Sequence, residues 1–304
     1  MPPKKAAKKT AAATAKDEAK AHDQAGKDAA AAEDVKEEIA QNGEKEQKST
    51  KQSAPSKKRK KLLNYLLSKE CDELLRPDDE AEDVQKRGNI KTYSSSTLSV
   101  FEELICAVIL SRPISHRLGQ RTIRTILNDP YNFNTAKAIK DAGTDKTHKA
   151  MWDARTQHKE KTASQLSAVA DLVLENENVS KVLSDKDVDP DEALEMLKKE
   201  IKGFGETSSK ILLRRVQWIW SKAFPFVDNV SWKGLKALGL PEEAEPLNKF
   251  LGEHWKSLDT KHLKVDGGEE AKKRRAFVVL VERATSCELE NKTNELLAAA
   301  ADSK

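Results

Sequence analysis

The chain has 304 residues, a formal net charge of +4 and three widely spaced cysteines without a CxxC pair. That length suffices for one large domain or two small ones with a tail, and the cysteine pattern argues against a disulfide framework or a zinc module. No apolar run approaches the roughly 20 residues needed to span a bilayer, and the N-terminus lacks an apolar signal core. We therefore expect a soluble intracellular protein with no membrane contact.

The first 61 residues differ in composition from the rest. They carry sixteen Lys/Arg against ten Asp/Glu, no aromatic residue and almost no branched apolar residue. Such a segment buries too little surface to offset its ordering entropy, so we predict a disordered tail over residues 1–61. The remaining 243 residues sum to a charge of about −2, so any basic surface on the folded part must be local.

The tail ends in a compact basic cluster, PSKKRKK, at residues 55–61. Clusters of this kind are typical of nuclear import signals or of phosphate-binding patches, and they also arise by chance in lysine-rich tails. We interpret this one as an import signal and expect a nuclear protein, although a role as a DNA clamp stays open. The residues of the signal are Lys57, Lys58, Arg59, Lys60 and Lys61.

Residues 62–304 predict one helical domain. Apolar residues recur at helical spacing over 62–75, and a Ser99/Glu102 capping box opens an almost wholly apolar helix over 99–111. Convincing strand alternation and repeat periods are absent from the sequence, so we predict an all-α fold. Further helices are expected over 119–127, 135–141, 146–155, 161–176, 190–202, 208–223, 229–238, 242–258, 269–286 and 288–301.

A glycine hairpin separates two of these helices. In KGFGETSSKILL (202–213), Gly203 and Gly205 flank Phe204, polar residues follow and an apolar run begins. Glycines allow positive φ and close backbone approach, while Ser208 and Ser209 can satisfy the free amides of a new helix. The positive end of such a helix is a ready anion site. An ordinary helix–helix turn is the alternative for this segment taken alone.

Four segments between residues 96 and 240 carry a resemblance when they are taken in order. They are FEELICAVILSRPISH (101–116), ARTQHKEKTASQL (154–166), IKGFGETSSKILL (201–213) and FPFVDNVSWKGLKALGL (224–240). Together they resemble the helix-hairpin-helix DNA glycosylase superfamily of endonuclease III and the adenine glycosylases. The specific part is the hairpin followed about two dozen residues later by Val-Asp. The resemblance implies a two-lobed helical fold, completed by C-terminal helices over 241–304, with double-stranded DNA as the partner.

The resemblance gives Asp228 the role of the catalytic carboxylate. Breaking an N-glycosidic bond passes through an oxocarbenium-like state, which a nearby carboxylate stabilises, after the base has been rotated out of the duplex. A simpler interpretation is that Asp228 caps the helix that begins at Asn229, and the two roles are compatible. The resemblance further implies a monovalent cation on the hairpin carbonyls and DNA-backbone contacts from Gly203, Phe204, Gly205, Thr207, Ser208, Ser209 and Lys210.

Three departures from the family pattern change these expectations. Thr207 stands where bifunctional members place the lysine that attacks the sugar, so we expect a monofunctional enzyme and only a phosphate contact or a solvated side chain from Lys210. Cys287 alone cannot replace four clustered cysteines, so no iron–sulfur cluster is expected. Pro113 occupies the place of the glutamine that fills the gap left by the flipped base. The substitute wedge residues are Arg112, Ile114 and His116.

Three hypotheses of different classes follow. The first is a nuclear, monomeric, monofunctional DNA glycosylase of base-excision repair, a hydrolase without a cofactor or metal. The second is a catalytically degenerate protein that keeps the scaffold and binds DNA or chromatin. The third is an all-helical protein–protein adaptor whose hairpin is only a turn. Both DNA-binding hypotheses predict an affinity that falls steeply with salt, and the adaptor predicts none. The stretch KKRR (272–275) fits a phosphate contact, although a solvated helix face is the ordinary expectation.

Overall fold

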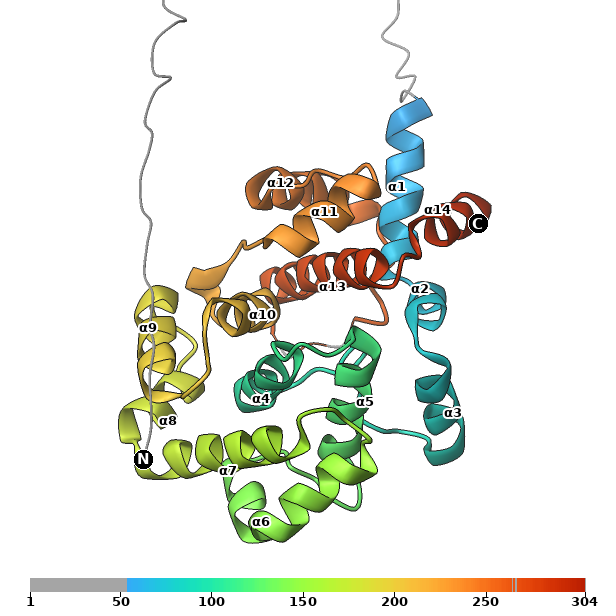
Figure 1. The fold of residues 1–304 in the computed structure, drawn as a ribbon. Helices are drawn as coiled ribbons and strands as arrows, with labels where there is room; N and C mark the ends of the chain where they lie inside the picture. The colour runs from blue at the N-terminus through green and yellow to red at the C-terminus, as the bar shows by residue number, and fades with distance from the viewer. Residues whose placement is uncertain (1–53, 264, 266, 304) are drawn as a thin grey trace, which may run out of the picture. The chain divides into compact units, whose positions relative to one another are not determined.

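The computed structural model describes residues 54–263, 265 and 267–303. This part of the chain contains fourteen α-helices, two short 3-10 helices and no β-strand (Figure 1). None of its helices is both long and apolar enough to cross a membrane. The α-helices are α1 (Ala54–Leu67), α2 (Lys69–Leu75), α3 (Asp78–Arg87), α4 (Val100–Leu110), α5 (His116–Leu127), α6 (Ala136–Asp153), α7 (Lys159–Glu175), α8 (Glu177–Ser184), α9 (Pro190–Glu200), α10 (Glu206–Val216), α11 (Asn229–Ala237), α12 (Ala244–His254), α13 (Glu269–Leu289) and α14 (Thr293–Asp302). The 3-10 helices are η1 (Ser221–Ala223) and η2 (Trp255–Ser257).

The all-α prediction is confirmed for the described residues, and so is the Ser99/Glu102 capping box at the start of α4. Several boundaries differ from the prediction. The helix expected over 62–75 breaks at Ser68, whose hydroxyl accepts from the Cys71 amide and starts α2. The two helices expected over 135–141 and 146–155 are present and share the label α6; they are separated at Gly143, whose backbone is not helical, with φ +73°.

Helix α3 is absent from the predicted elements, because it docks through charge rather than through an apolar face. The buried Arg124 of α5 donates to Asp79 and Asp83 at 2.7 Å each and to Glu80 at 3.3 Å. Helix α8 was also not predicted; it begins at Asn176, whose side chain caps its first turn.

The predicted disordered tail lies, for residues 1–53, outside the described residues. Residues 54–61 form the first turns of α1, so the predicted boundary at residue 61 is wrong. The helix extends across it because Leu63 and Leu66, further along α1, are buried in a core shared with α13 and α14. Lys61 Nζ also donates to Ser303 O at 3.0 Å, which ties α1 to the end of α14.

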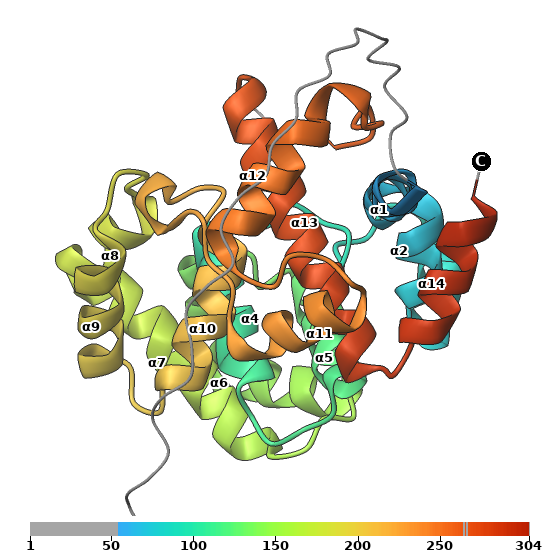
Figure 2. The ribbon, with the colours of Figure 1, turned by 90° about the horizontal axis from the view of Figure 1, so that it is seen from above.

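The buried apolar side chains form two cores. The central core, between Tyr93 and Trp220, is built from α4 to α10, with its largest members being Tyr93, Phe133, Leu104, Ile105, Ile109 and Trp220. The terminal core joins both ends of the described chain, because α1 and α2 pack with α11 to α14 around Leu63, Leu66, Leu235, Phe277, Leu280 and Val281. Figure 2 shows α1, α2 and α14 together on one side and α8 and α9 on the opposite side.

Helix α13 lies where the two cores meet. It contacts α1, α2, α11, α12 and α14 of the terminal core, and it also contacts α10 of the central core. Figure 1 shows α13 between α11 and α10. A close approach at Gly234 sets the distance between α11 and α13, because a Cβ there would lie 2.1 Å from the backbone oxygen of Ala284. The hairpin leads into α10 and Asp228 begins α11, and both of these helices contact α13.

Candidate nucleic-acid interface

The hairpin joins α9 to α10 by a turn that requires glycine at its first position. Gly203 has φ +83°, a left-handed conformation that other residues adopt only with strain. A Cβ there would also lie 3.3 Å from Gln165 Nε2. The Phe204 amide donates to Ile201 O at 3.0 Å, and its ring is buried in the central core. Phe204 therefore anchors the turn and does not reach a ligand.

The start of α10 has no side-chain cap. Gly205 is its N-cap residue, and no described side chain accepts from the first-turn amides. The prediction that Ser208 and Ser209 cap this helix is wrong, because both are buried and the Ser209 hydroxyl donates to Gly205 O at 3.0 Å. A Cβ at Gly205 would meet nothing within 4 Å. An anion can therefore approach amides that need an acceptor.

Charged side chains around the hairpin have mixed signs. Glu206 lies between Lys198 and Lys210, each with its nitrogen 3.4 Å from a Glu206 oxygen. Hydrogen bonds from Lys198 and Lys210 lower the pKa of Glu206 below its ordinary value. Lys210 is therefore a half-buried partner of Glu206, while Thr207 and Lys202 are exposed beside the turn.

A hydrogen-bond bridge connects the loop after α4 to the hairpin. The Arg112 guanidinium donates to Gln165 Oε1, and Gln165 Nε2 donates to Lys202 O at 2.9 Å. A groove of about 650 Å³, lined in part by Arg112, Gln165 and Gly203, lies along this bridge. The structure thus brings one predicted wedge residue, Arg112, to the hairpin.

The other two wedge candidates point into the protein instead. Ile114 packs against the central core. His116 Nδ1 lies 3.1 Å from Glu290 Oε1, and its ring stands edge-on to Tyr93 with 6.5 Å between the ring centroids. These contacts leave neither side chain free to enter a duplex in this conformation.

Asp228 is the N-cap residue of α11, as the simpler interpretation predicted. Its Oδ1 accepts from the backbone amides of Val230 at 3.0 Å and Ser231 at 2.8 Å, and from the Ser231 hydroxyl at 2.9 Å. Its Oδ2 accepts from Arg214 Nη1 at 2.6 Å. The residue is only 6% exposed and does not line the groove at the hairpin. The carboxylate can meet a substrate only if Arg214 moves away.

The Arg214–Asp228 pair belongs to a buried ionic network between the two cores. Arg214 Nε also donates to Glu282 on α13, and Arg215 on α10 binds Glu103 on α4 with 2.9 Å between Nη2 and Oε1. The Arg215 guanidinium stacks over the Tyr93 ring, with 4.4 Å between its Cζ and the ring centroid. Charges drawn from α4, α10, α11 and α13 thus meet in one place.

The network keeps its carboxylates on α11 and α13 ionised. Burial acts to raise the pKa of Asp228, but the Arg214 guanidinium and the hydrogen bonds from Ser231 together lower it below the ordinary value. Burial likewise opposes ionisation of Glu282, whose pKa is nevertheless lowered by Arg214 and Arg215. Both groups therefore act as fixed negative charges that hold α10.

The sequence alone does not predict this network. One signal for it was present, because Glu103 interrupts a helix that is apolar nearly all round, and a charge at such a position needs a buried partner. Nothing in the sequence pointed to Arg214, Arg215 and Glu282 as the partners, since they lie far apart along the chain. Among the described residues, no group of three or more His, Cys, Asp or Glu side chains is arranged to hold a metal ion.

The monovalent cation implied by the resemblance finds no clear cage at the hairpin. The carbonyl oxygens of Ile201 and Lys202 accept from the Phe204 amide and from Gln165, and that of Gly205 accepts from Ser209.

No protein-family model, no curated protein and no solved structure matches the chain. The resemblance to helix-hairpin-helix glycosylases therefore depends on the motifs and geometry of this chain alone.

Proposed function

We propose that this protein binds the phosphate backbone of duplex DNA through its glycine hairpin. The observation that carries the proposal is the uncapped start of α10 at Gly205, directly after the turn at Gly203. The first-turn amides of a helix lack intrahelical acceptors, and the helix dipole favours an anion there. Contacts of this kind hold a duplex without reading its sequence.

The arrangement of the two cores supports a scaffold of the helix-hairpin-helix glycosylase type. In this proposal the family-like part spans residues 96–240, and the C-terminal helices over 241–304 complete the second lobe together with α1 and α2. Exposed Lys202 and the nearby Arg112 add local positive charge to a folded part that has little of it overall. The adaptor hypothesis offers no reason for an exposed, uncapped helix start next to these cations.

The geometry of Asp228 favours a DNA-binding protein that does not cleave the glycosidic bond. Its two oxygens accept four hydrogen bonds, from Val230, Ser231 and Arg214, and its ion pair with Arg214 is buried. A carboxylate that stabilises an oxocarbenium-like state must lie within contact distance of the sugar. Here Arg214 instead lies 2.6 Å from Oδ2 of this carboxylate.

Base excision is the second candidate, and one observation favours it. Asp228 is ionised at the start of a helix, at the position that the family uses for its catalytic carboxylate. If duplex binding draws Arg214 away, the same carboxylate faces the space between the cores. Thr207 in place of the family's lysine then makes the enzyme a monofunctional hydrolase that acts without a cofactor.

Nuclear location and a monomeric state belong to the same proposal. The import signal lies in the first turns of α1, where Lys57, Lys58 and Arg59 are exposed, while Lys61 binds the end of α14. Replacing Lys57, Lys58 and Arg59 by Gln should move a fluorescent fusion of the full chain from the nucleus to the cytoplasm. The matched replacement of Lys86, Lys233 and Lys236 by Gln, at exposed positions outside the hairpin, should not.

Duplex binding can be measured by fluorescence anisotropy with the full chain. Affinity for a labelled duplex should fall by an order of magnitude or more between about 50 mM and about 200 mM salt, as expected when phosphates are contacted. Thr207→Glu places a negative charge at the exposed hairpin and should weaken binding about tenfold. Thr144→Glu, on an exposed part of α6, is the matched control. Equal affinities of both variants and the native chain for the duplex would show that the hairpin does not contact DNA.

A lesion panel separates the two candidate functions. Duplexes that carry uracil, hypoxanthine, alkylated bases or an oxidised guanine opposite adenine are incubated with the native chain and with Asp228→Asn, and abasic sites are then cleaved by alkali. We expect no base release with binding intact. Release by the native chain that is lost in Asp228→Asn would establish the glycosylase instead.

A further inference from the structure

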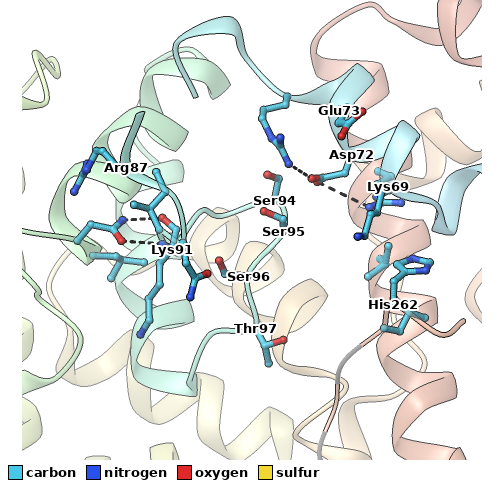
Figure 3. A pocket seen from close by; sticks show the side chains of 18 of the residues that line it. Lys69, Asp72, Glu73, Arg87, Lys91, Ser94, Ser95, Ser96, Thr97 and His262 are labelled. Carbon is cyan, nitrogen blue, oxygen red and sulfur yellow. Dashed lines mark hydrogen bonds and ion pairs between the residues drawn. The ribbon is translucent and has the colours of Figure 1, made fainter. Parts of the chain in front are cut away.

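A cavity of about 860 Å³ lies where the two cores meet, away from the hairpin. Its walls come from five segments: α2, the end of α3 with the stretch up to α4, the end of α5 with the turn after it, the loop before α13, and α13. Figure 3 shows Arg87 and Lys91 on one wall, Lys69 and His262 on the other, and the Ser94–Thr97 loop between them. This volume is in the range of small-molecule sites, which often form between packed units.

Positive charge dominates the lining. Three carboxylates, those of Asp72, Glu73 and Asp129, face twice as many cations. Asp72 is already neutralised, because Arg76 donates to it and Arg283 Nη2 lies 3.9 Å away. The lining cations are Lys69, Arg76, Arg87, Lys91, Arg275 and Arg283. Lys91 is paired with Glu102 behind the lining, so Lys69, Arg87 and Arg275 remain as the lining cations without an ion pair among the described residues. Such a surplus in a cleft recruits an anion rather than a metal ion.

Arg275 shows that this surplus is not balanced by the protein. Its side chain lines the cavity although the residue is only 4% exposed, and its Nη2 donates to Ser96 O at 3.2 Å. Its Nη1 has no hydrogen-bond partner among the described residues. Burial and the neighbouring Arg215 lower the pKa of Arg275 to about 10. The expected solvated helix face over 272–275 is therefore wrong at this position.

Neutral donors complete the lining. The Ser96 hydroxyl accepts from the Thr92 amide, so its own hydrogen remains available to donate. Thr97 and Asn89 are exposed and line the same cavity. The Arg87 guanidinium donates one hydrogen bond, at 2.9 Å, to the backbone oxygen of Asp129. Hydroxyls, amides and forked guanidinium groups are the donors that phosphate groups bind.

We propose that this cavity binds a small phosphate-bearing molecule, such as a phosphate ester or a polyphosphate. A phosphate carries up to two negative charges and three strong acceptor oxygens, which matches cations on two facing walls better than a single carboxylate does. The volume exceeds that of one inorganic phosphate, so the ligand carries more than one phosphate or an organic body. Because the ligand contacts both cores, it also stabilises their packing. This site is separate from the hairpin and does not depend on DNA binding there.

Calorimetry with the full chain tests the proposal, with pyrophosphate, tripolyphosphate and ATP as probes and sodium sulfate at matched ionic strength as the reference. We expect at least one phosphate probe to bind and sulfate not to bind. The double variant Lys69→Gln/Arg87→Gln should weaken that binding about tenfold or more, which corresponds to about 1.4 kcal/mol. The matched double variant Lys86→Gln/Lys233→Gln removes two exposed positive charges outside the cavity and should stay within about twofold of the native chain.

Thermal unfolding of each variant shows whether it is folded, since all four positions are exposed. No binding by any phosphate probe, or equal losses in the two double variants, would overturn the proposal. A second arm distinguishes a small ligand from the backbone of nucleic acid. Saturating duplex DNA should leave the binding of the phosphate probe unchanged, and so should Thr207→Glu. Displacement of the probe by the duplex would assign the cavity to the nucleic-acid surface and overturn the small-molecule proposal.

Discussion

The guanidinium of Arg214 holds the carboxylate of Asp228 across the junction of the two cores, with 2.6 Å between Nη1 and Oδ2. Arg214 lies two turns along α10 from Thr207, or about 10 Å along the helix axis. The residue that the resemblance assigns to chemistry therefore caps α11 and pairs with α10. A structural role explains every contact that it makes.

Removing Arg214 should be more damaging than neutralising Asp228. Arg214→Met leaves two buried carboxylates, Asp228 and Glu282, without their shared partner, and should lower the free energy of unfolding by about 3–5 kcal/mol. Asp228→Asn keeps a side chain that caps helices well and should cost less. Urea unfolding followed by circular dichroism measures both variants. Lys86→Met, at an exposed position on α3, should change stability by less than about 0.5 kcal/mol.

Low pH should destabilise the protein by protonating Asp228, which joins α11 to α10 through Arg214. Burial opposes ionisation, yet Arg214 and Ser231 lower the pKa below the ordinary 3.8, so the folded state binds this proton less tightly than the unfolded state. The stabilisation is therefore complete above pH 3.8 and is lost as the pH falls from there through the lower folded-state pKa. The measurement is the free energy of unfolding at about pH 7 and at about pH 3, for the native chain and for Asp228→Asn.

In that comparison the variant should lose less stability on acidification than the native chain does. Burial raises the pKa values of Glu80 and Glu103, so protonation of these two groups at low pH favours the folded state. This effect is the same in both proteins. The difference between the two proteins isolates Asp228 from them. Identical acid losses would mean that its ion pair contributes nothing to stability.

How far the sequence predicts the structure depends on how far apart in the chain the interacting residues lie. Local features are predicted correctly. The Ser99/Glu102 capping box, the turn at Gly203 and the cap at Asp228 each depend on residues within a few positions of one another. Contacts between residues far apart in the chain are not predicted. The Arg124 contacts that dock α3, and the Glu103–Arg215 pair, join residues more than forty positions apart, and only the fold brings them together.

The Ser208/Ser209 prediction failed for a related reason. Both residues lie on the buried side of α10, so neither hydroxyl faces the free amides, and a propensity for capping does not show which side of a helix is buried. The same limit explains why KKRR (272–275) was expected to be solvated, although Arg275 turns inward. The sequence does not predict the cavity lined by Arg275, because its walls come from five separate segments.

Two glycines on helices should respond in opposite directions to alanine. Gly234→Ala puts a Cβ 2.1 Å from Ala284 O, a backbone atom that cannot move without separating α11 from α13. We expect a loss of about 3 kcal/mol or failure to fold. Gly252→Ala on α12 meets nothing within 4 Å and should stabilise the protein by about 0.5–1 kcal/mol through helix propensity. Thermal unfolding checks both, and a neutral Gly234→Ala would show that the two helices are not in close contact.

Replacing the two hairpin glycines by alanine should have different effects: one replacement should lower stability and the other should weaken DNA binding. Gly203→Ala forces a left-handed φ of +83° on alanine and crowds Gln165, which should cost about 1–2 kcal/mol of stability. Gly205→Ala has an ordinary extended backbone and open space around its Cβ, so its stability cost should stay below about 1 kcal/mol.

The methyl group of Gly205→Ala, however, stands where a phosphate would approach the amides of α10. Anisotropy at low salt should therefore show duplex affinity reduced severalfold in Gly205→Ala while the fold stays intact. If Gly205→Ala binds duplex as tightly as the native chain, the amides of α10 do not contact the phosphate and the proposed interface is wrong.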